Sequence, residues 1–355
     1  MPDPVPAVSL ALQGGSTHGA FTWGVLDRLL QEVAAGQLEI AAISGTSAGA
    51  LNAVATAVGL MDGGAELART RLRELWTLVS RRGAAAGNAF FGYGEPGPFG
   101  FNIDWNPVAI MVEAAGLVVS PYTNPFYVDA LTPLLQAAFP GDTLDRLNRA
   151  AGPRLFVTAV DVASNARKVF SQPEVGIDAL RASACLPTEF KAVTIGGVPY
   201  WDGGFVGNPA LAPLVGIASD VLLVMVNPLD RTGMPPTTQR EILDRLNEIT
   251  FNASVVLEID AIETVNRILD ELERAGTPYS GRYRRVNLHL IRNDRFTATL
   301  GVVSKNSTSW PFLTALHDAG YQTADAWWAE NRGALGQRSS TDVKVALTAS
   351  VLKAG

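Results

Sequence analysis

Short runs of apolar residues recur along the chain at lengths suited to buried strands. They are rich in Val, Ile, Leu and Ala, and they predict strands at residues 8–12, 39–44, 154–161, 221–226 and 286–291. In other stretches apolar residues recur every three or four positions, which predicts helices at 20–34, 48–58, 64–79, 129–138, 177–183, 238–273 and 311–330. This alternation of strands and helices favours a parallel-rich sheet covered by helices on both faces.

The long helix expected at 238–273 has a regular apolar spacing of its own. Ile242, Leu246, Ile249 and Ile268 recur at helical intervals, with charged residues between them. This pattern is typical of a helix that lays one apolar face on a core.

Residues 81–128 interrupt the alternation. Their stretch 88–101 is rich in glycine, proline and aromatic residues, and irregular segments of this length usually have a function. Two interpretations stay open: a cap-like insertion over a substrate pocket, or a packed excursion over the edge of the sheet. We expect one domain over 1–335, in which 236–335 forms a C-terminal helical and strand extension, followed by a tail at 336–355.

Composition excludes several classes of function. The chain has 355 residues, of which 47% are hydrophobic, so it can bury a large core. Its net charge of −6 argues against nucleic acid as a partner and against electrostatic docking on anionic membranes. A single cysteine, Cys185, and three scattered histidines predict no internal disulfide, no metal site and no cofactor.

The chain shows no targeting signal. The first residues lack a positive region and a long apolar run, and no stretch of 18 uninterrupted apolar residues follows. We therefore expect a cytoplasmic protein, for which transient contact with a membrane surface stays open.

The most informative motif is Gly45-Thr46-Ser47-Ala48-Gly49, a G-x-S-x-G pattern between an expected strand and an expected helix. A sharp turn in that place strains the serine backbone and exposes its hydroxyl, and the two glycines leave room for the close approach of strand and helix. The helix N-terminus would favour a negative charge near the serine. Taken alone, the pattern also fits an ordinary tight turn.

Two further glycine-rich segments have the same ambiguity. Residues 13–19, Gln-Gly-Gly-Ser-Thr-His-Gly, join a strand to a helix and can form a nest of N–H groups for an anion, or a turn without a ligand. Their spacing is not that of a nucleotide-binding loop. Asp202-Gly203-Gly204 places a carboxylate at the end of an apolar stretch, where Asp-Gly is also a common turn pair.

Together, in this order, the three segments resemble the patatin-like phospholipase family over roughly residues 7–230. Ser183-Ala-Cys-Leu-Pro187 and Asn208-Pro209 are similar to the family as well. The resemblance implies a three-layer α/β/α fold of the FabD/lysophospholipase-like kind and a serine hydrolase with a Ser–Asp dyad. By position, Ser47 is the nucleophile and Asp202 the base.

The resemblance also assigns roles to the glycine-rich loop. Gly14, Gly15 and Ser16 would supply the amides of an oxyanion hole, and Gly19, Gly45, Gly49, Gly203 and Gly204 would support the motifs. The sequence departs from the family at Ser16, where a third glycine is usual, and at His18, where Arg or Lys is usual. His18 raises the expectation of activity that depends on pH between about pH 5 and 8.

The chemistry can also be argued from the residues alone. A serine hydroxyl needs a positioned base, but His289 lies in an expected strand and His317 in an expected helix, so neither sits in a catalytic turn. A carboxylate can replace histidine if burial raises its pKa, and Asp202 follows Tyr200-Trp201.

The sequence therefore predicts an acyl-ester hydrolase of EC class 3.1.1, acting on a lipid or small ester substrate through an acyl-enzyme on Ser47. Phospholipase A, lysophospholipase and lipase or esterase activities stay open. An acyltransferase that uses the same acyl-enzyme and a non-catalytic lipid-binding protein are the alternatives.

Overall fold

The computed structural model describes residues 5–85, 101–104, 119–231, 235–280 and 283–340. These residues form an eight-stranded mixed sheet with strand order β5-β6-β3-β2-β1-β7-β8, and β4 pairs with β3 off this path. The strands are β1 (Ala7–Leu12), β2 (Glu39–Thr46), β3 (Arg154–Asp161), β4 (Arg167–Ser171), β5 (Val193–Ile195), β6 (Val198–Asp202), β7 (Asp220–Val224) and β8 (Asn287–Ile291).

The centre of the sheet is parallel and one side is antiparallel. β3, β2, β1, β7 and β8 run in the same direction, whereas β4 and β6 each pair antiparallel with β3 and β5 pairs antiparallel with β6. All five expected strands are present. The sequence pattern missed β4, β5 and β6, because strands of three to five partly exposed residues have no continuous apolar run.

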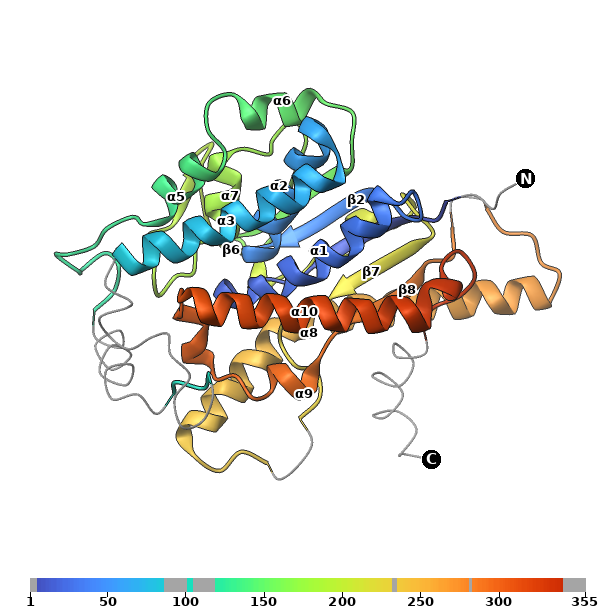
Figure 1. The fold of residues 1–355 in the computed structure, drawn as a ribbon. Coiled ribbons are helices and arrows are strands. Elements are labelled where there is room, and N and C mark those ends of the chain that lie inside the picture. Colours follow the sequence, from blue (N-terminus) through green and yellow to red (C-terminus); the bar gives the residue numbers. More distant parts are fainter. Residues whose placement is uncertain (1–4, 86–100, 105–118, 232–234, 281–282, 341–355) are drawn as a thin grey trace.

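Helices cover both faces of this sheet (Figure 1). They are α1 (Gly19–Ala34), α2 (Ala48–Gly63), α3 (Ala65–Ala85), α5 (Leu131–Ala138), α6 (Thr143–Arg149), α7 (Ile177–Ser183), α8 (Gln239–Arg274), α9 (Asp294–Thr297) and α10 (Trp310–Asn331), with short 3-10 turns η1 (Ser16–His18), η2 (Gly203–Phe205), η3 (Ala212–Leu214), η4 (Val302–Asn306) and η5 (Arg332–Ala334). The seven expected helices are present, while the shorter α6 and α9 were not expected.

Strand alternation divides the core into two layers. On β1, Leu10 and Leu12 face the larger layer, which includes α1, α2, α3 and α10, whereas Ala11 faces the smaller layer beneath α8. Successive side chains of a strand point to opposite faces, so one apolar strand supplies both layers. The predicted three-layer fold with a parallel-rich sheet is confirmed.

The inward face of α8 differs from the sequence expectation. Leu246 and Ile249 are 53% and 51% exposed, while Asp244, Glu248 and Asn252 on the opposite face are buried. The expectation that the apolar spacing packs on the core is wrong for this half of the helix, because its inward side chains contact polar groups: Asn252 Nδ2 donates to the Pro228 carbonyl.

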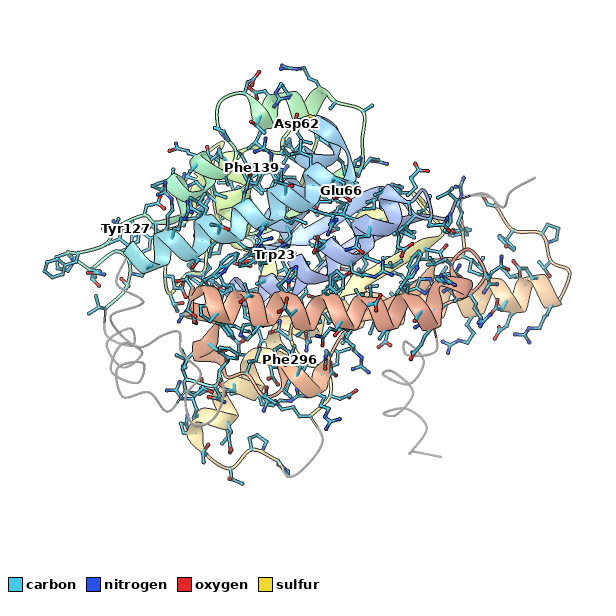
Figure 2. All side chains as sticks on the ribbon, viewed as in Figure 1. Trp23, Asp62, Glu66, Tyr127, Phe139 and Phe296 are labelled. Carbon is cyan, nitrogen blue, oxygen red and sulfur yellow. The ribbon has the colours of Figure 1, made fainter. Side chains whose placement is uncertain are left out.

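Helices α1 and α10 are in unusually close contact. A Cβ atom on Gly24 would overlap the carbonyl oxygen of His317, and one on Gly320 would overlap that of Phe21. Beside this contact, the Trp23 ring lies 4.1 Å from the His317 ring between centroids. Figure 2 labels Trp23 where α1 and α10 pack together. Helix α1 begins at the glycine-rich loop, so the packing of α10 on α1 also holds that loop in place.

Some expectations fall on residues that the structure does not describe. Of residues 81–128, expected as a cap-like insertion, 86–100 and 105–118 lie outside the described residues, and so do 341–355 of the expected tail. Among the described residues, no helix combines the length and the apolar character needed to span a bilayer.

We predict that Gly320→Ala lowers the free energy of unfolding by about 1–3 kcal/mol, because the added methyl group forces α10 away from α1. Urea unfolding with an unchanged m value measures this effect. Gly333→Ala is the matched control, since a Cβ there meets no atom within 4 Å. Equal midpoints for the two variants would contradict the proposed close contact.

Candidate active site

Ser47 occupies the turn between β2 and α2 in a strained backbone conformation. Its φ is 54° and its ψ is −126°, in a region that residues with a side chain seldom adopt. A Cβ on Gly45 would lie 2.5 Å from the Gly49 carbonyl oxygen, and one on Gly49 would overlap that of Leu12. The turn is therefore as tight as the sequence pattern predicts, and both glycines are required by contact.

The backbone of Ser47 is fixed while its hydroxyl group stays available. The Ser47 N–H donates to Ser183 Oγ at 2.9 Å, and its carbonyl accepts from the Ala50 N–H in the first turn of α2. The side chain makes no capping bond to the helix. The hydroxyl group thus lies beside a helix N-terminus, where a negative charge is favoured.

Asp202 lies at the end of β6 and is fully buried. Its Oδ1 accepts from the Gly204 N–H at 2.7 Å, whereas Oδ2 has no hydrogen-bond partner among the described residues. A Cβ on Gly203 would overlap the Thr158 carbonyl, and one on Gly204 would overlap the Phe251 ring. The two glycines therefore allow the turn to pack tightly, and this packing buries the carboxyl group.

Burial raises the pKa of Asp202 to about 7. The Gly204 N–H and the Ser47 hydroxyl oppose this shift, the Glu189 carboxylate adds to it, and the Lys305 ammonium opposes it. Ser47 is thus close enough to act on the carboxyl group, although no hydrogen bond of full geometry joins Oδ2 to it. The structure brings the two residues together, and it gives Asp202 the pKa of a base that works near neutral pH.

The glycine-rich loop lies directly against Ser47. A Cβ on Gly14 would come within 2.8 Å of Ser47 Cβ. The Gly14 N–H donates to Asn208 Oδ1 at 2.7 Å in this structure, so its role as an oxyanion donor stays a prediction. Among the described residues, the N–H groups of Gly15 and Ser16 have no acceptor. These two amides are the available donors of the loop.

Ser16 shows why glycine suits its position. Its φ of 49° lies in the left-handed region, where a residue with a Cβ is less stable than glycine by about 1–2 kcal/mol. The serine adopts this conformation nevertheless, at the start of η1. Its departure from the family pattern leaves its N–H in place.

His18 is buried, and its neutral form is favoured. Its Nε2 lies 2.8 Å from Ser304 Oγ, and because that hydroxyl donates to the Gly301 carbonyl, Nε2 carries the proton. Burial, and then the charge of Lys305, hold the pKa of His18 well below its usual range. His18 is therefore neutral at neutral pH, and the expectation that it makes activity depend on pH stays a prediction. Gly19, next in the chain, meets Ala48 closely.

The remaining histidines and the cysteine are engaged elsewhere. His289 Nε2 pairs with Asp220 Oδ1 at 2.9 Å, and His317 Nε2 lies 3.3 Å from Asp27 Oδ2. Cys185 is buried, and desolvation raises the pKa of its thiol to about 12, so it is not a nucleophile at neutral pH.

Sequence reasoning missed two residues behind the loop. Gln13 Oε1 accepts from the N–H groups of Val226 and Asn227, both at 2.8 Å, which ties the loop to the end of β7. Lys305 of η4 contacts the same region from the far end of the chain. Neither residue belongs to a motif with a recognisable spacing.

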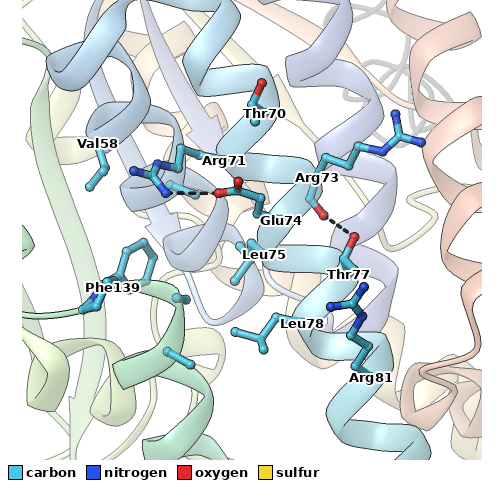
Figure 3. Close-up of a pocket in the computed structure, with 14 residues that line it drawn as sticks. Val58, Thr70, Arg71, Arg73, Glu74, Leu75, Thr77, Leu78, Arg81 and Phe139 are labelled. Carbon is cyan, nitrogen blue, oxygen red and sulfur yellow. Dashed lines mark hydrogen bonds and ion pairs between the residues drawn. The ribbon is translucent and has the colours of Figure 1, made fainter.

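A pocket in another part of the fold lies away from these residues. It has a volume of about 470 Å³ between α2, α3 and α5, with Val58, Leu75 and Phe139 among its apolar lining and Arg71 beside it (Figure 3). Arg71 is paired with Glu74 at 3.1 Å. Neither Ser47 nor Asp202 lines this pocket, so it does not hold the candidate nucleophile or its base.

Comparison with known proteins finds one related family. A family model described as patatin-like phospholipase matches residues 10–215, which include the glycine-rich loop, Ser47 and Asp202. Among solved structures, VipD from Legionella pneumophila aligns with a TM-score of 0.44 and 18% identity, over 92% of this chain and 67% of that one. No curated protein sequence matches the chain significantly.

The buried carboxyl group generates a prediction about stability. The pKa of Asp202 is higher in the folded protein than its usual value of 3.8, so the folded state favours the protonated form. The contribution of Asp202 to wild-type stability is therefore greatest below about pH 4, and this contribution is lost as pH rises to about 7. We predict that, between pH 4 and pH 7.5, the free energy of unfolding of Asp202→Asn rises relative to that of wild type by roughly 2–4 kcal/mol.

Urea unfolding at the two pH values measures this gain. Asp145→Asn, which removes an exposed carboxylate on α6, controls for the loss of one negative charge. A constant difference between Asp202→Asn and wild type at both pH values would show that Asp202 has an ordinary pKa.

Proposed function

Because the chain belongs to the patatin-like phospholipase family, whose members are lipid acyl hydrolases in general, we propose that it hydrolyses carboxylic esters of lipids through an acyl-enzyme on Ser47. The observation that carries this proposal is the pairing of a strained serine turn with a buried carboxyl group that has one unpartnered oxygen. A weak nucleophile needs such a base beside it.

In the proposed acylation step, Asp202 Oδ2 takes the proton of the Ser47 hydroxyl while Oγ attacks the ester carbonyl carbon. The carbonyl π electrons move to its oxygen, and the N–H groups of Gly15 and Ser16 stabilise the resulting oxyanion. The tetrahedral intermediate then collapses, its bond to the alcohol oxygen breaks, and the protonated Asp202 gives its proton to the departing alcohol.

In the proposed deacylation step, water replaces the alcohol. Asp202 takes a proton from the water as it attacks the acyl carbonyl, and it returns that proton to Ser47 Oγ when the fatty acid leaves. Because burial raises the pKa of Asp202 to about 7, the base is fully ionised only above that pH. The rate of both steps should therefore rise with pH up to about pH 7.

We predict that a fluorophosphonate forms one adduct with the wild-type protein, observed by intact mass, and none with Ser47→Ala. Hydrolysis of p-nitrophenyl esters of increasing chain length, and of a phospholipid in mixed micelles, should fall at least about 10³-fold in kcat/KM in Ser47→Ala and in Asp202→Asn. Ser164→Ala, an exposed serine in the β3–β4 turn, is the matched control.

Several outcomes would decide against this proposal. An adduct that persists in Ser47→Ala would remove Ser47 as the nucleophile. A folded wild-type protein that binds lipid but gives neither adduct nor hydrolysis would favour a non-catalytic role. Transfer of the acyl group to added glycerol or lysolipid, faster than hydrolysis, would make the protein an acyltransferase.

A further inference from the structure

The 3-10 turn η4 lies against the end of the glycine-rich loop. Thr17 Oγ1 donates to the Lys305 carbonyl at 2.7 Å, and His18 Nε2 donates to Ser304 Oγ at 2.8 Å. These bonds join segments almost 290 residues apart in the chain. The turn η4 lies outside the stretch that the family model matches. A distant segment thus fixes the loop that is proposed to hold the oxyanion.

The side chain of Lys305 makes further contacts close to the loop. Its Nζ donates to Asn227 Oδ1 at 2.8 Å and to Asn247 Oδ1 at 2.7 Å, and it lies 5.4 Å from the centre of the Phe251 ring. Asn227 Nδ2 in turn donates to the Gly14 carbonyl at 3.4 Å. Lys305 therefore reaches the glycine-rich loop through one intervening amide.

The same lysine also lies close to the turn that carries Asp202. The Phe251 ring over which its ammonium group sits packs against Gly204, two residues after Asp202. Two neutral amide oxygens accept its N–H groups, and no carboxylate of the described residues forms an ion pair with it. Because no described carboxylate pairs with it directly, the charge of Lys305 acts on carboxyl groups beyond contact distance.

The titratable groups around this lysine come from three elements of the fold. Glu248 and Asp244 of α8 and Asp202 of β6 favour its charged form, and neutral His18 lies on η1. Glu248 is already paired with Arg231 and Arg245, at 2.5 and 2.9 Å.

Asp244 lies near a further carboxyl group, that of Asp104, and together with burial this raises the pKa of Asp244 to about 7. Glu248 and Asp244 thus act on the ammonium group more strongly than Asp202 does, and the charge of Lys305 lowers the pKa of Asp202 less than the Gly204 N–H and the Ser47 hydroxyl do.

We propose that Lys305 is a positioning residue of the active site, which holds the glycine-rich loop through Asn227 and whose positive charge favours the carboxylate form of Asp202. This inference rests on the proposed function for its effect on catalysis. Its electrostatic part concerns Asp202 alone and can be measured without turnover.

The titration of Lys305 gives this role a distinct signature. Burial lowers the pKa of the ammonium group to about 8, so it is charged below that pH and neutral above it. Asp202, with a pKa of about 7, gains its base form as pH rises through 7. Above pH 8 the ammonium charge is lost, but Asp202 is already ionised there, so the charge of Lys305 should affect the rate most below about pH 8.

The test is the pH dependence of fluorophosphonate labelling in wild type, Lys305→Gln and Lys305→Arg. We predict that Lys305→Gln labels at least about 10-fold more slowly at pH 7.5, with its rising limb moved to higher pH because Asp202 has lost a favourable charge. Lys305→Arg should regain most of the rate and keep it at pH 9, because a guanidinium group stays charged there.

Lys168→Gln is the matched control. Lys168 lies on β4 and pairs with Glu174 at 3.0 Å, away from the contacts of Lys305. Its labelling profile should equal that of wild type. An unchanged profile in Lys305→Gln, or a rising limb of Lys305→Arg displaced as far as that of Lys305→Gln, would overturn the inference. If Lys305→Gln does not fold, the rising limb of Lys305→Arg still decides, because a limb displaced from that of wild type contradicts the role of the positive charge.

A second measurement separates this inference from the proposed function. The stability gained by Asp202→Asn at pH 7 should be larger in the Lys305→Gln background than in wild type, because the carboxylate has lost a favourable charge. An equal gain in both backgrounds would overturn the inference even for an active enzyme. A larger gain in a protein that never labels would support it while the proposed function fails.

Discussion

Desolvation of a single carboxyl group is the constraint on which the rest of the site depends. Asp202 is fully buried because Gly203 and Gly204 let the chain turn against β3 and the ring of Phe251. The same packing that makes this carboxylate costly to the fold gives it the proton affinity of a base near neutral pH. A more hydrated Asp202 would make a more stable protein with a weaker base.

The surroundings of this carboxyl group come from the whole length of the chain. The family match ends at residue 215, yet α8 and η4 supply the polar groups behind the glycine-rich loop. The outward apolar face of α8 follows from this arrangement, because its inward positions serve Asn252 and Glu248 and their partners. The C-terminal extension is thus joined to the site by hydrogen bonds as well as by apolar packing.

The sequence predicts best what short segments determine. Ser47 with its two flanking glycines, and the parallel strands with their apolar runs, follow from local spacing, and the structure agrees with both. Gly14 was harder to interpret, because the acceptor of its N–H is Asn208, 194 residues away. His18 has an ordinary imidazole in the sequence, and only its burial beside Ser304 shows that it does not titrate near neutral pH. The role proposed for Lys305 depends on tertiary contacts and cannot be predicted from the sequence around it.

The close contact between α1 and α10 has a consequence for motion. Each helix receives a backbone carbonyl of the other at a glycine, so the pair can neither slide nor rotate without a clash. Since α1 starts directly after the glycine-rich loop, we expect this loop to move with α1 and α10 as one body. Any opening that admits a long acyl chain must therefore arise from segments other than this helix pair, and the geometry around Ser47 is preserved while they move.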